Sequence, residues 1–387
     1  MKYITAIIDT AIDRKNHAKH LKELEFFMID SGEMIQLKES RLLENPSHGG
    51  ECIRYFEDGS QSCADYFILL QSTEDGVCNL HDLVTSLNWC IVNGVSLISL
   101  SMGTTQYSDS AEFAGTMNCM HKNGICLIAG ASNSRKLSYP ACFDECIGVC
   151  HDYTNATIKG QFAYIENPYD GIEVVLNPKA SSVAFIDSTS MATAYFAGLV
   201  AKAIKDGDTK PSEVKKWIAS TGEKLNAKAI YDYTRNSIFY DYTEDVVVVA
   251  LSTEKKTLAF RRELQKLFLE NKYFCLSLFA SENVVQKNNL FNHEFIRVTN
   301  NRDSSYEDYV ELMIKLCEPN LILIDLNEYE APTDVIISKT VQTGRKGDVF
   351  MLNLEQNTPQ ETFEQIVSHF ESDKDSETDD IKDNHDQ

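Results

Sequence analysis

The sequence predicts an α/β protein: a doubly wound, mainly parallel sheet with helices on both faces, followed by a smaller C-terminal α/β domain. Three observations support this fold class. Short apolar runs alternate with amphipathic stretches along residues 1–225. Polar residues follow directly after several of these runs, as at the carboxyl edge of a parallel sheet. After residue 245 the alternation begins again.

The length allows two domains. The chain has 387 residues, and 43% of them are hydrophobic, which is enough to form two cores. We expect a first domain over residues 1–245, a C-terminal α/β domain over 255–370 and a tail over 371–387. Since the tail is dominated by Asp and Glu and has almost no apolar residues, we expect it to be disordered.

Charge and hydropathy limit the partners. The net charge of −22, with no basic stripe, argues against nucleic acid as a partner. No apolar run reaches membrane-spanning length, and the first apolar run ends too early, at Asp9, for a signal peptide. We therefore expect a cytoplasmic protein that does not bind membranes. The oligomeric state stays open.

The first elements are a strand, a hairpin and a βα pair. Residues 3–8 are an apolar run that ends at Asp9, and residues 26–29 and 34–37 flank a turn typical of a hairpin. A helix is predicted to start at Glu51, directly after His48 and two glycines. Residues 66–70 then indicate a buried strand and 82–93 a helix that ends at Asn93-Gly94.

The same alternation continues to residue 225. A strand over 95–100 runs into Ser101-Met102-Gly103, and a helix over 111–123 precedes a strand over 125–129. That strand leads into a loop at 130–134, and residues 146–150 read as the next strand. A helix then opens directly behind Ser190 and continues to about residue 205, and another starts at Pro211.

The second domain reads as alternating strands and helices. Strands are predicted over 246–251, 273–279, 295–298, 321–326, 335–338 and 349–352, and helices over 258–270, 306–317 and 362–370. The basic turn at 344–347 is interpreted as a hairpin tip. Since this region has no phosphate-binding glycine loop and no metal-ligand cluster, we assign it no chemistry.

Three residues suggest nucleophilic catalysis. Ser190 lies at the start of a helix, where unpaired backbone N–H groups can hold an oxyanion. Asp9 ends the first strand, and His48 precedes two glycines. This order of Asp, His and Ser, with Thr189 before the serine and Met-Ala after it, resembles the subtilisin-like serine peptidases. The resemblance extends over about residues 1–225.

The resemblance implies a site and a reaction. Asp9, His48 and Ser190 would form the catalytic triad, and the Asn133 amide would bind the oxyanion. A peptide or protein substrate would bind in extended conformation and be cut through an acyl-enzyme, without cofactor or metal. The substrate-binding residues implied are Ser101, Met102, Gly103, Gly130, Ala131 and Ser132.

The eleven cysteines are expected to be buried free thiols in a reducing cytosol. Cys142, Cys146 and Cys150 recur every four residues, which invites a metal site. We do not favour it, because Cys146 and Cys150 would point to the same face of a strand as ordinary core residues.

The resemblance leaves more than one function open. Asp9 lies so close to the amino terminus that we expect no pro-segment, and hence an intracellular peptidase of narrow specificity that matures one peptide or protein precursor. One alternative is a catalytically impaired scaffold that binds peptides or partner proteins, because Ser188 and Ala194 replace the family's usual Gly and Pro. Another places the main activity in the second domain.

Overall fold

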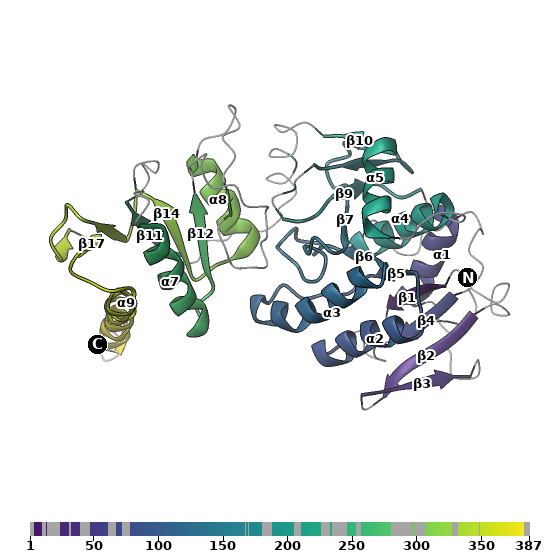
Figure 1. Cartoon of the computed structure of the whole chain (residues 1–387), viewed down its shortest axis with the longest axis horizontal. Helices are drawn as coiled ribbons and strands as arrows, with labels where there is room; N and C mark the ends of the chain where they lie inside the picture. The colour runs from purple at the N-terminus through teal and green to yellow at the C-terminus, as the bar shows by residue number, and fades with distance from the viewer. Residues whose placement is uncertain are drawn as a thin grey trace. The chain divides into compact units, whose positions relative to one another are not determined.

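The computed structural model describes residues 4–9, 13, 24–30, 32–38, 47–60, 67–71, 78–166, 168, 170–179, 188–204, 210–225, 233, 246–252, 257–279, 296–297, 306–326, 332–347 and 349–382. Two compact units divide the chain, Met1–Tyr240 and Asp241–Gln387. Each unit contains its own sheet, flanked by helices (Figure 1).

The described residues of the first unit form a ten-stranded sheet. Its helices are α1 (His48–Ser60), α2 (Leu80–Val92), the short η3 (Tyr107–Asp109), α3 (Ser110–Lys122), α4 (Thr189–Ala203) and α5 (Pro211–Thr221). Its strands are β1 (Thr5–Asp9), β2 (Leu24–Asp30), β3 (Glu33–Leu37), β4 (Phe67–Gln71), β5 (Leu97–Leu100), β6 (Cys126–Gly130), β7 (Ile147–His151), β8 (Phe162–Tyr164), β9 (Val174–Leu176) and β10 (Glu223–Lys224).

Parallel pairing dominates this sheet. The strand order is β10-β8-β9-β7-β6-β5-β1-β4-β2-β3, and only the β2–β3 and β8–β9 pairs are antiparallel among the described strands. The α/β fold class predicted from the sequence is confirmed. The sequence missed β8, β9 and β10, because strands of two or three residues are too short to produce a detectable alternation.

The alternation of side chains along each strand divides the core into two layers. Ile7 belongs to the cluster formed with α1, α4 and α5, which also contains Leu97, Ile128 and Val149 from neighbouring strands. Ile8 lies outside this cluster and is also fully buried. Helices α2 and α3 lie side by side elsewhere on this unit (Figure 1). Asp9 follows Ile7 by two residues, so its side chain lies on the same face of the sheet, the one that α1 and α4 cover.

Two glycines let α1 and α4 pack backbone to backbone. A Cβ on Gly59 would lie 2.2 Å from the Tyr195 carbonyl oxygen, and one on Gly198 would lie 2.2 Å from that of Phe56. Such contacts are possible only without side chains. Since α1 begins at His48 and α4 begins beside Ser190, this packing fixes the starts of the two helices relative to one another.

The second unit has a seven-stranded sheet of order β13-β12-β14-β11-β15-β17-β16, in which only β16 and β17 pair antiparallel among the described strands. Its helices are α7 (Thr257–Glu270), α8 (Tyr306–Cys317) and α9 (Pro359–Lys382). Its strands are β11 (Val247–Leu251), β12 (Cys275–Phe279), β13 (Ile296–Arg297), β14 (Leu321–Asp325), β15 (Val335–Ser338), β16 (Gly344–Lys346) and β17 (Val349–Asn353).

Two features of this unit differ from the sequence expectations. The basic turn at 344–347 contributes β16, so most of it is a strand of the hairpin and not its tip. Helix α9 continues to Lys382 and therefore includes most of the stretch expected to be a disordered tail. The amphipathic pattern that predicts helix stops near residue 370, beyond which the sequence is almost entirely polar.

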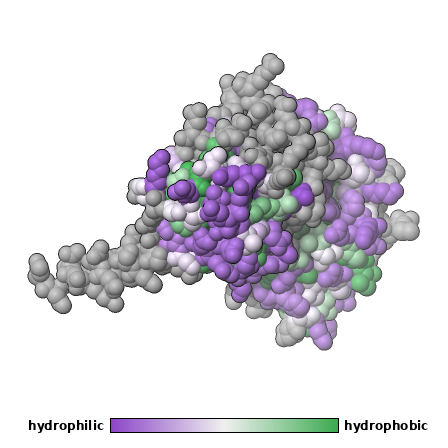
Figure 2. Space-filling view, turned by 60° about the vertical axis from the view of Figure 1, so that its left-hand side comes forward, coloured by the Kyte–Doolittle hydropathy of each residue, from purple (hydrophilic) through white to green (hydrophobic). Residues whose placement is uncertain are grey.

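On the face in Figure 2, hydrophilic residues cover much of the coloured surface and hydrophobic ones form small patches between them. Among the described residues the exposed large hydrophobic side chains are Ile35, Val92 and Ile158. No helix in the described part of the chain is both long and apolar enough to cross a membrane.

Candidate active site

The carboxyl edge of the sheet collects the predicted site residues. Because β1 and β5 are parallel and Ile8 pairs with Leu100, Asp9 and Ser101 lie side by side at the carboxyl ends of these neighbouring strands. Leu100 in turn pairs with Ala129 of β6, which places Gly130 and the loop after it next along the same edge. The strand register therefore brings together segments that lie far apart in the sequence.

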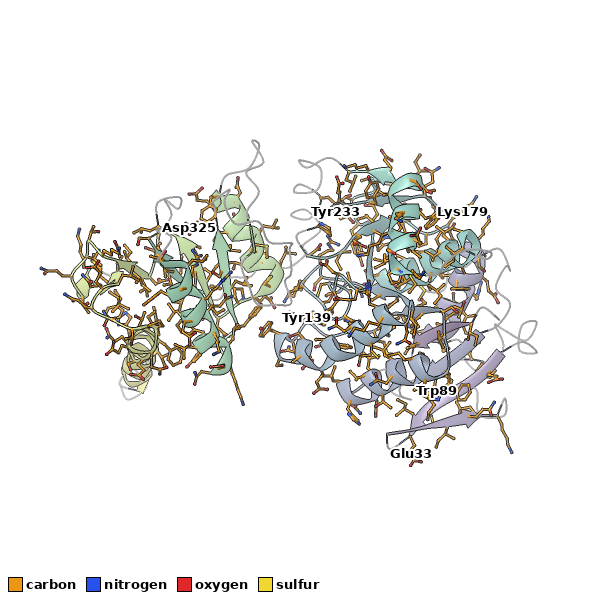
Figure 3. All side chains as sticks on the ribbon, in the orientation of Figure 1. Glu33, Trp89, Tyr139, Lys179, Tyr233 and Asp325 are labelled. Atoms are coloured by element: carbon orange, nitrogen blue, oxygen red, sulfur yellow. The ribbon has the colours of Figure 1, made fainter. Side chains whose placement is uncertain are left out.

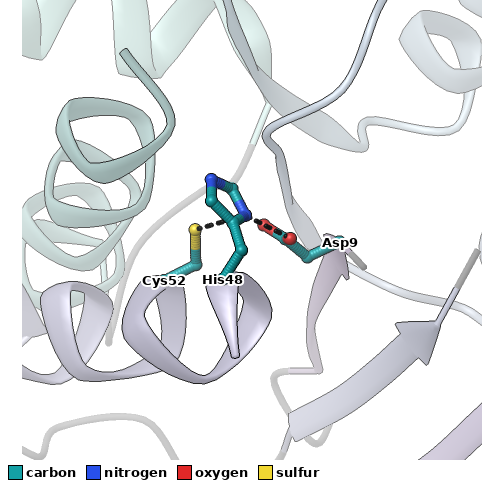
Figure 4. Close-up of side chains that lie close together, drawn as sticks. All are labelled: Asp9, His48 and Cys52. Atoms are coloured by element: carbon teal, nitrogen blue, oxygen red, sulfur yellow. Dashed lines mark hydrogen bonds and ion pairs between the residues drawn. The ribbon is translucent and has the colours of Figure 1, made fainter. Parts of the chain in front are cut away.

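Asp9 and His48 form a hydrogen-bonded pair. The distance from His48 Nδ1 to Asp9 Oδ1 is 2.7 Å, and the two side chains are 34% and 2% exposed. The helix begins at His48 itself and not at Glu51 as predicted, because Ser47 precedes it and accepts a hydrogen bond from Gly50 N–H through its Oγ. His48 therefore projects from the first turn of α1 toward the end of β1 (Figure 4).

The second oxygen of the Asp9 carboxylate is also bound. Ser101 Oγ donates to Asp9 Oδ2 at 2.5 Å. Both oxygens of the buried carboxylate are therefore held, one by the imidazole and one by the hydroxyl. Ser101 was predicted to bind substrate, and the structure gives its side chain this supporting contact in addition.

These contacts shift the two pKa values apart. Burial alone would raise the pKa of Asp9, but the hydrogen bond and charge of His48, with the Cys52 and Ser101 hydrogen bonds, lower it below its ordinary value. The hydrogen bond to Asp9 raises the pKa of His48, against the opposing effect of burial. Because an ionised carboxylate can only accept, the shared proton resides on Nδ1, and Nε2 is the basic nitrogen.

Ser190 is the second residue of α4. Ser188 caps this helix by accepting a hydrogen bond from Met191 N–H at 3.4 Å. The carbonyl oxygen of Ser190 lies 4.0 Å from Cys52 Sγ, and that sulfur lies 4.0 Å from His48 Nδ1. The half-buried Ser190 and His48 therefore each have one atom 4.0 Å from the Cys52 sulfur.

Asn133 is exposed, and its side chain has a defined orientation. Thr189 N–H and the Tyr153 hydroxyl both donate to Asn133 Oδ1, each at 3.1 Å. A backbone N–H can pair only with the oxygen of the amide, so the Nδ2 hydrogens point the other way and are available as donors. Tyr153 itself stacks edge-on against His151, with ring centroids 4.7 Å apart.

The loop that carries Tyr153 is built on Asp152. This carboxylate accepts hydrogen bonds from the backbone N–H and the hydroxyl of both Thr154 and Thr157, at 2.6–3.0 Å. Although burial opposes it, these bonds lower the pKa of Asp152. These four hydrogen bonds fold the turn that carries Tyr153, whose hydroxyl contacts Asn133.

A buried cation anchors the loop of Asn133. Arg135 is 1% exposed and pairs with Asp170 Oδ2 at 2.7 Å. Its guanidinium also donates to Cys150 Sγ at 3.0 Å and lies 5.5 Å from the ring centroid of Tyr233, which is labelled in Figure 3. Arg135 thus connects the loop to three other segments of the unit.

The other predicted substrate-binding residues lie along the same edge. Met102 is half-buried and Gly103 exposed, and a Cβ on Gly103 would lie 2.4 Å from the Tyr139 carbonyl oxygen. Ala131 is 8% exposed and its N–H donates to Val149 O at 2.8 Å. Ser132 N–H donates to Ser138 Oγ at 3.0 Å, and a Cβ on Gly130 would lie 2.9 Å from Thr193 Oγ1. Their role in binding stays a prediction.

Sequence reasoning missed Cys52, Tyr153 and Arg135. Cys52 follows His48 by four residues, which places both on one helix face, so its position was readable once the helix start was known. Nothing in the sequence pattern singles out Tyr153 or Arg135. The cysteines Cys142 and Cys146 are free thiols in the structure, as the other described cysteines are.

The fold and these contacts define an α/β protein with a hydrogen-bonded carboxylate–imidazole pair and a serine in the first turn of a helix that packs against α1. No family model matches the chain. Subtilisin DY of Bacillus licheniformis is 26% identical over 159 residues, which is 38% of this chain and 57% of that protein. Subtilisin BL of Lederbergia lenta is 25% identical over 163 residues, 41% of this chain and 60% of that protein.

Among solved structures, the nisin leader peptidase NisP from Lactococcus lactis is similar at a TM-score of 0.42 and 13% identity, covering 59% of this chain and 86% of that one. The similarity to subtilisins confirms the resemblance to the subtilisin-like serine peptidases. The chain spans less than two thirds of the length of those curated relatives.

Proposed function

We propose that the chain is a serine endopeptidase that uses Asp9, His48 and Ser190. The observation that carries the proposal is the 2.7 Å hydrogen bond between buried Asp9 and half-buried His48 at the start of α1, a helix that packs against α4, which carries Ser190. This arrangement provides a base with a fixed tautomer, and the neighbouring helix α4 carries the proposed nucleophile.

In the proposed reaction His48 Nε2 takes the hydroxyl proton as Ser190 Oγ bonds to the carbonyl carbon of the scissile peptide. Asp9 stabilises the imidazolium that forms. The Asn133 amide and the Ser190 N–H donate to the new oxyanion. When the tetrahedral species collapses, the peptide C–N bond breaks and His48 returns the proton to the leaving amine. Water then releases the acyl group from Ser190 by the same steps in reverse.

A fluorophosphonate probe tests this proposal, because it bonds only to an activated hydroxyl. Labelling of the full chain at Ser190, lost in Ser190→Ala and greatly slowed in Asp9→Asn, is expected. Ser212→Ala is a matched control, since Ser212 is an exposed serine at the second position of α5. Folded protein that takes up no probe would refute the peptidase and favour the peptide-binding scaffold.

We propose further that the substrate is a specific peptide or protein precursor in the cytoplasm. The ten described cysteines are free thiols and most of them are buried, which fits a reducing compartment. Incubating the chain with a peptide library and reading cut sites by mass spectrometry tests the specificity. Cleavage at many unrelated sequences would contradict a narrow substrate range.

The second unit is a weaker candidate for the main activity. Ligands of open α/β sheets bind at the carboxyl ends of the strands. There, Asp325 at the end of β14 is paired with Arg261 Nη1 at 2.6 Å, and Arg261 Nε also donates to Ser277 Oγ at 2.7 Å. Both members of this ion pair are nearly fully buried (Asp325 is labelled in Figure 3). A buried, mutually neutralised pair favours a structural role at that position.

A further inference from the structure

Cys52 is a buried thiol that the proposed peptidase mechanism does not use. It lies one helical turn after His48 on α1, so both side chains occupy the same helix face. Its sulfur is 4.0 Å from His48 Nδ1 and 3.5 Å from Ser101 Oγ. Figure 4 shows the thiol on one side of the imidazole edge and the Asp9 carboxylate on the other.

The three side chains offer a set of metal ligands. One carboxylate oxygen of Asp9, one ring nitrogen of His48 and the Cys52 sulfur all lie within 4.8 Å of one another. Over the described ranges, this is the one group of three or more His, Cys, Asp or Glu side chains that converge in this way. Sulfur, imidazole nitrogen and carboxylate oxygen are the ligands that Zn²⁺ takes in proteins.

The geometry is close to what zinc requires. With Zn–N and Zn–O bonds of about 2.0 Å and Zn–S bonds of about 2.3 Å, tetrahedral ligand atoms lie about 3.3–3.5 Å apart. Here the imidazole nitrogen is 2.7 Å from the carboxylate oxygen and 4.0 Å from the sulfur. The first distance would have to open by about 0.6 Å and the second to close by about 0.5 Å. The third, from the carboxylate oxygen to the sulfur, lies within 4.8 Å.

We propose that Asp9, His48 and Cys52 bind a zinc ion and that the ion reversibly inhibits the peptidase; the second part rests on the proposed function. On binding, Zn²⁺ displaces the proton on His48 Nδ1 and the proton of the Cys52 thiol, and both go to solvent. The carboxylate and thiolate then neutralise the ion in a buried site, with water as the fourth ligand.

Inhibition follows from where the ion sits. The imidazole binds zinc through Nδ1, so Asp9 no longer stabilises a positive charge on the ring. The nearby dication opposes protonation of Nε2, and His48 cannot take the serine proton. Magnesium and calcium prefer oxygen ligands and should leave the enzyme active. A peptidase that matures one precursor would thus be restrained by the local zinc concentration.

Metal binding is tested first without any catalytic readout. The full chain with Ser190→Ala, which leaves all three ligands in place, is titrated with Co²⁺ as a spectroscopic substitute for zinc. One equivalent should produce the near-ultraviolet thiolate-to-cobalt absorption band, and Zn²⁺ should abolish it by competition. Adding Cys52→Val should remove the band and weaken zinc binding by more than the roughly 10- to 100-fold that outer-shell changes cost.

Cys119→Ser is the matched control for adventitious thiol binding, since Cys119 is an exposed cysteine on α3. Its band should equal that of the Ser190→Ala parent. A band that persists in Cys52→Val, one that disappears in Cys119→Ser, or no binding by the parent would overturn the proposed site.

Inhibition is measured with the wild-type residue at 190. Peptide hydrolysis by the wild type and by Cys52→Val is followed in Zn²⁺ and in excess chelator, and each rate is normalised to that variant's own rate in chelator. Zinc should suppress the wild type, chelator should restore it, and Cys52→Val should resist. Equal suppression of both would refute inhibition through this site. No hydrolysis by the wild type in chelator would instead refute the peptidase proposal, and the cobalt titration would still report on the metal site.

Discussion

Replacing Gly198 by Ala tests whether the contact between α1 and α4 sets the active site. The new Cβ would lie 2.2 Å from the Phe56 carbonyl oxygen, whereas carbon and oxygen atoms normally approach to about 3.3 Å. The obstacle is backbone and cannot rotate away. The two helices must therefore separate by about 1 Å, and this overpacking should cost about 1–3 kcal/mol of stability.

The catalytic cost should exceed the cost in stability. Helix α1 carries His48 and α4 carries Ser190, so their separation displaces the base from the nucleophile. A misplacement of about 1 Å lowers rates by about 10²-fold. We expect a folded Gly198→Ala protein whose kcat and fluorophosphonate labelling rate are both reduced by about that factor, measured where urea titration shows the variant to be native.

Gly115→Ala is the matched control. Gly115 lies in the middle of α3, and a Cβ built there meets no other atom within 4 Å. That substitution should leave the rate unchanged and stabilise the protein by about 0.5–1 kcal/mol, since alanine favours helix. A native Gly198→Ala protein with the wild-type rate, or an equal loss in Gly115→Ala, would refute the reasoning.

The remaining predictions concern orientation, proton transfer and stability. Tyr153→Phe removes one of the two hydrogen bonds that orient the Asn133 amide. Since such a hydrogen bond contributes a net stabilisation of about 0.5–1.5 kcal/mol, kcat should fall about 2- to 10-fold with KM unchanged. An unchanged kcat in Tyr153→Phe, measured together with a loss of about 10²-fold in Asn133→Ala, would exclude this role. The labelling rate should rise with pH through a midpoint above the ordinary histidine pKa of about 6.5, because Asp9 raises the pKa of His48. Asp9→Asn should move that midpoint down, and an unmoved midpoint would contradict the assignment. Arg135→Met leaves a buried carboxylate without its cation and should cost about 3–5 kcal/mol in urea unfolding; a loss below about 1 kcal/mol would contradict a structural ion pair.

As the pH rises, the raised pKa of His48 affects stability and activity in opposite directions. Because the pKa of His48 is raised in the folded state, its pair with Asp9 contributes stability that is fully present below the unfolded pKa of about 6.5. That contribution is lost as the pH rises through the folded pKa. The pH range in which the imidazole becomes a base is therefore also the range in which the pair stops stabilising the fold.

The sequence predicted the elements whose patterns repeat. The apolar run before Asp9 is β1, the hairpin is β2 and β3, and the helix behind Ser190 is α4, because each has several periods of alternation or a turn signal. It did not predict the start of α1 at His48, since Gly49 and Gly50 are poor helix formers. Tertiary context explains the difference: a Cβ on Gly50 would lie 2.0 Å from Asp13 Oδ2, so a larger residue there would have to displace the Asp13 side chain.

The contacts around the candidate site were less predictable than its main residues. Asp9, His48 and Ser190 each have a local signal, a strand end, a glycine pair or a helix start. By contrast, Tyr153 reaches Asn133 from a loop twenty residues further on, and only the completed fold places its hydroxyl 3.1 Å from the amide oxygen. Local periodicity has no information about such pairs.

Cys52 lies between these two cases, and it shows why residue spacing must be combined with topology. The spacing of four from His48 predicts proximity only if residues 48–52 are helical, which the two glycines argue against. The carboxylate completes the group only because β1 ends beside the first turn of α1 and the parity of β1 directs Asp9 to that face. Finding this group therefore requires the helical state of residues 48–52, the direction of the Asp9 side chain and the position of β1 beside α1. The thiol thus becomes a metal-ligand candidate only once the strand and the helix are placed together.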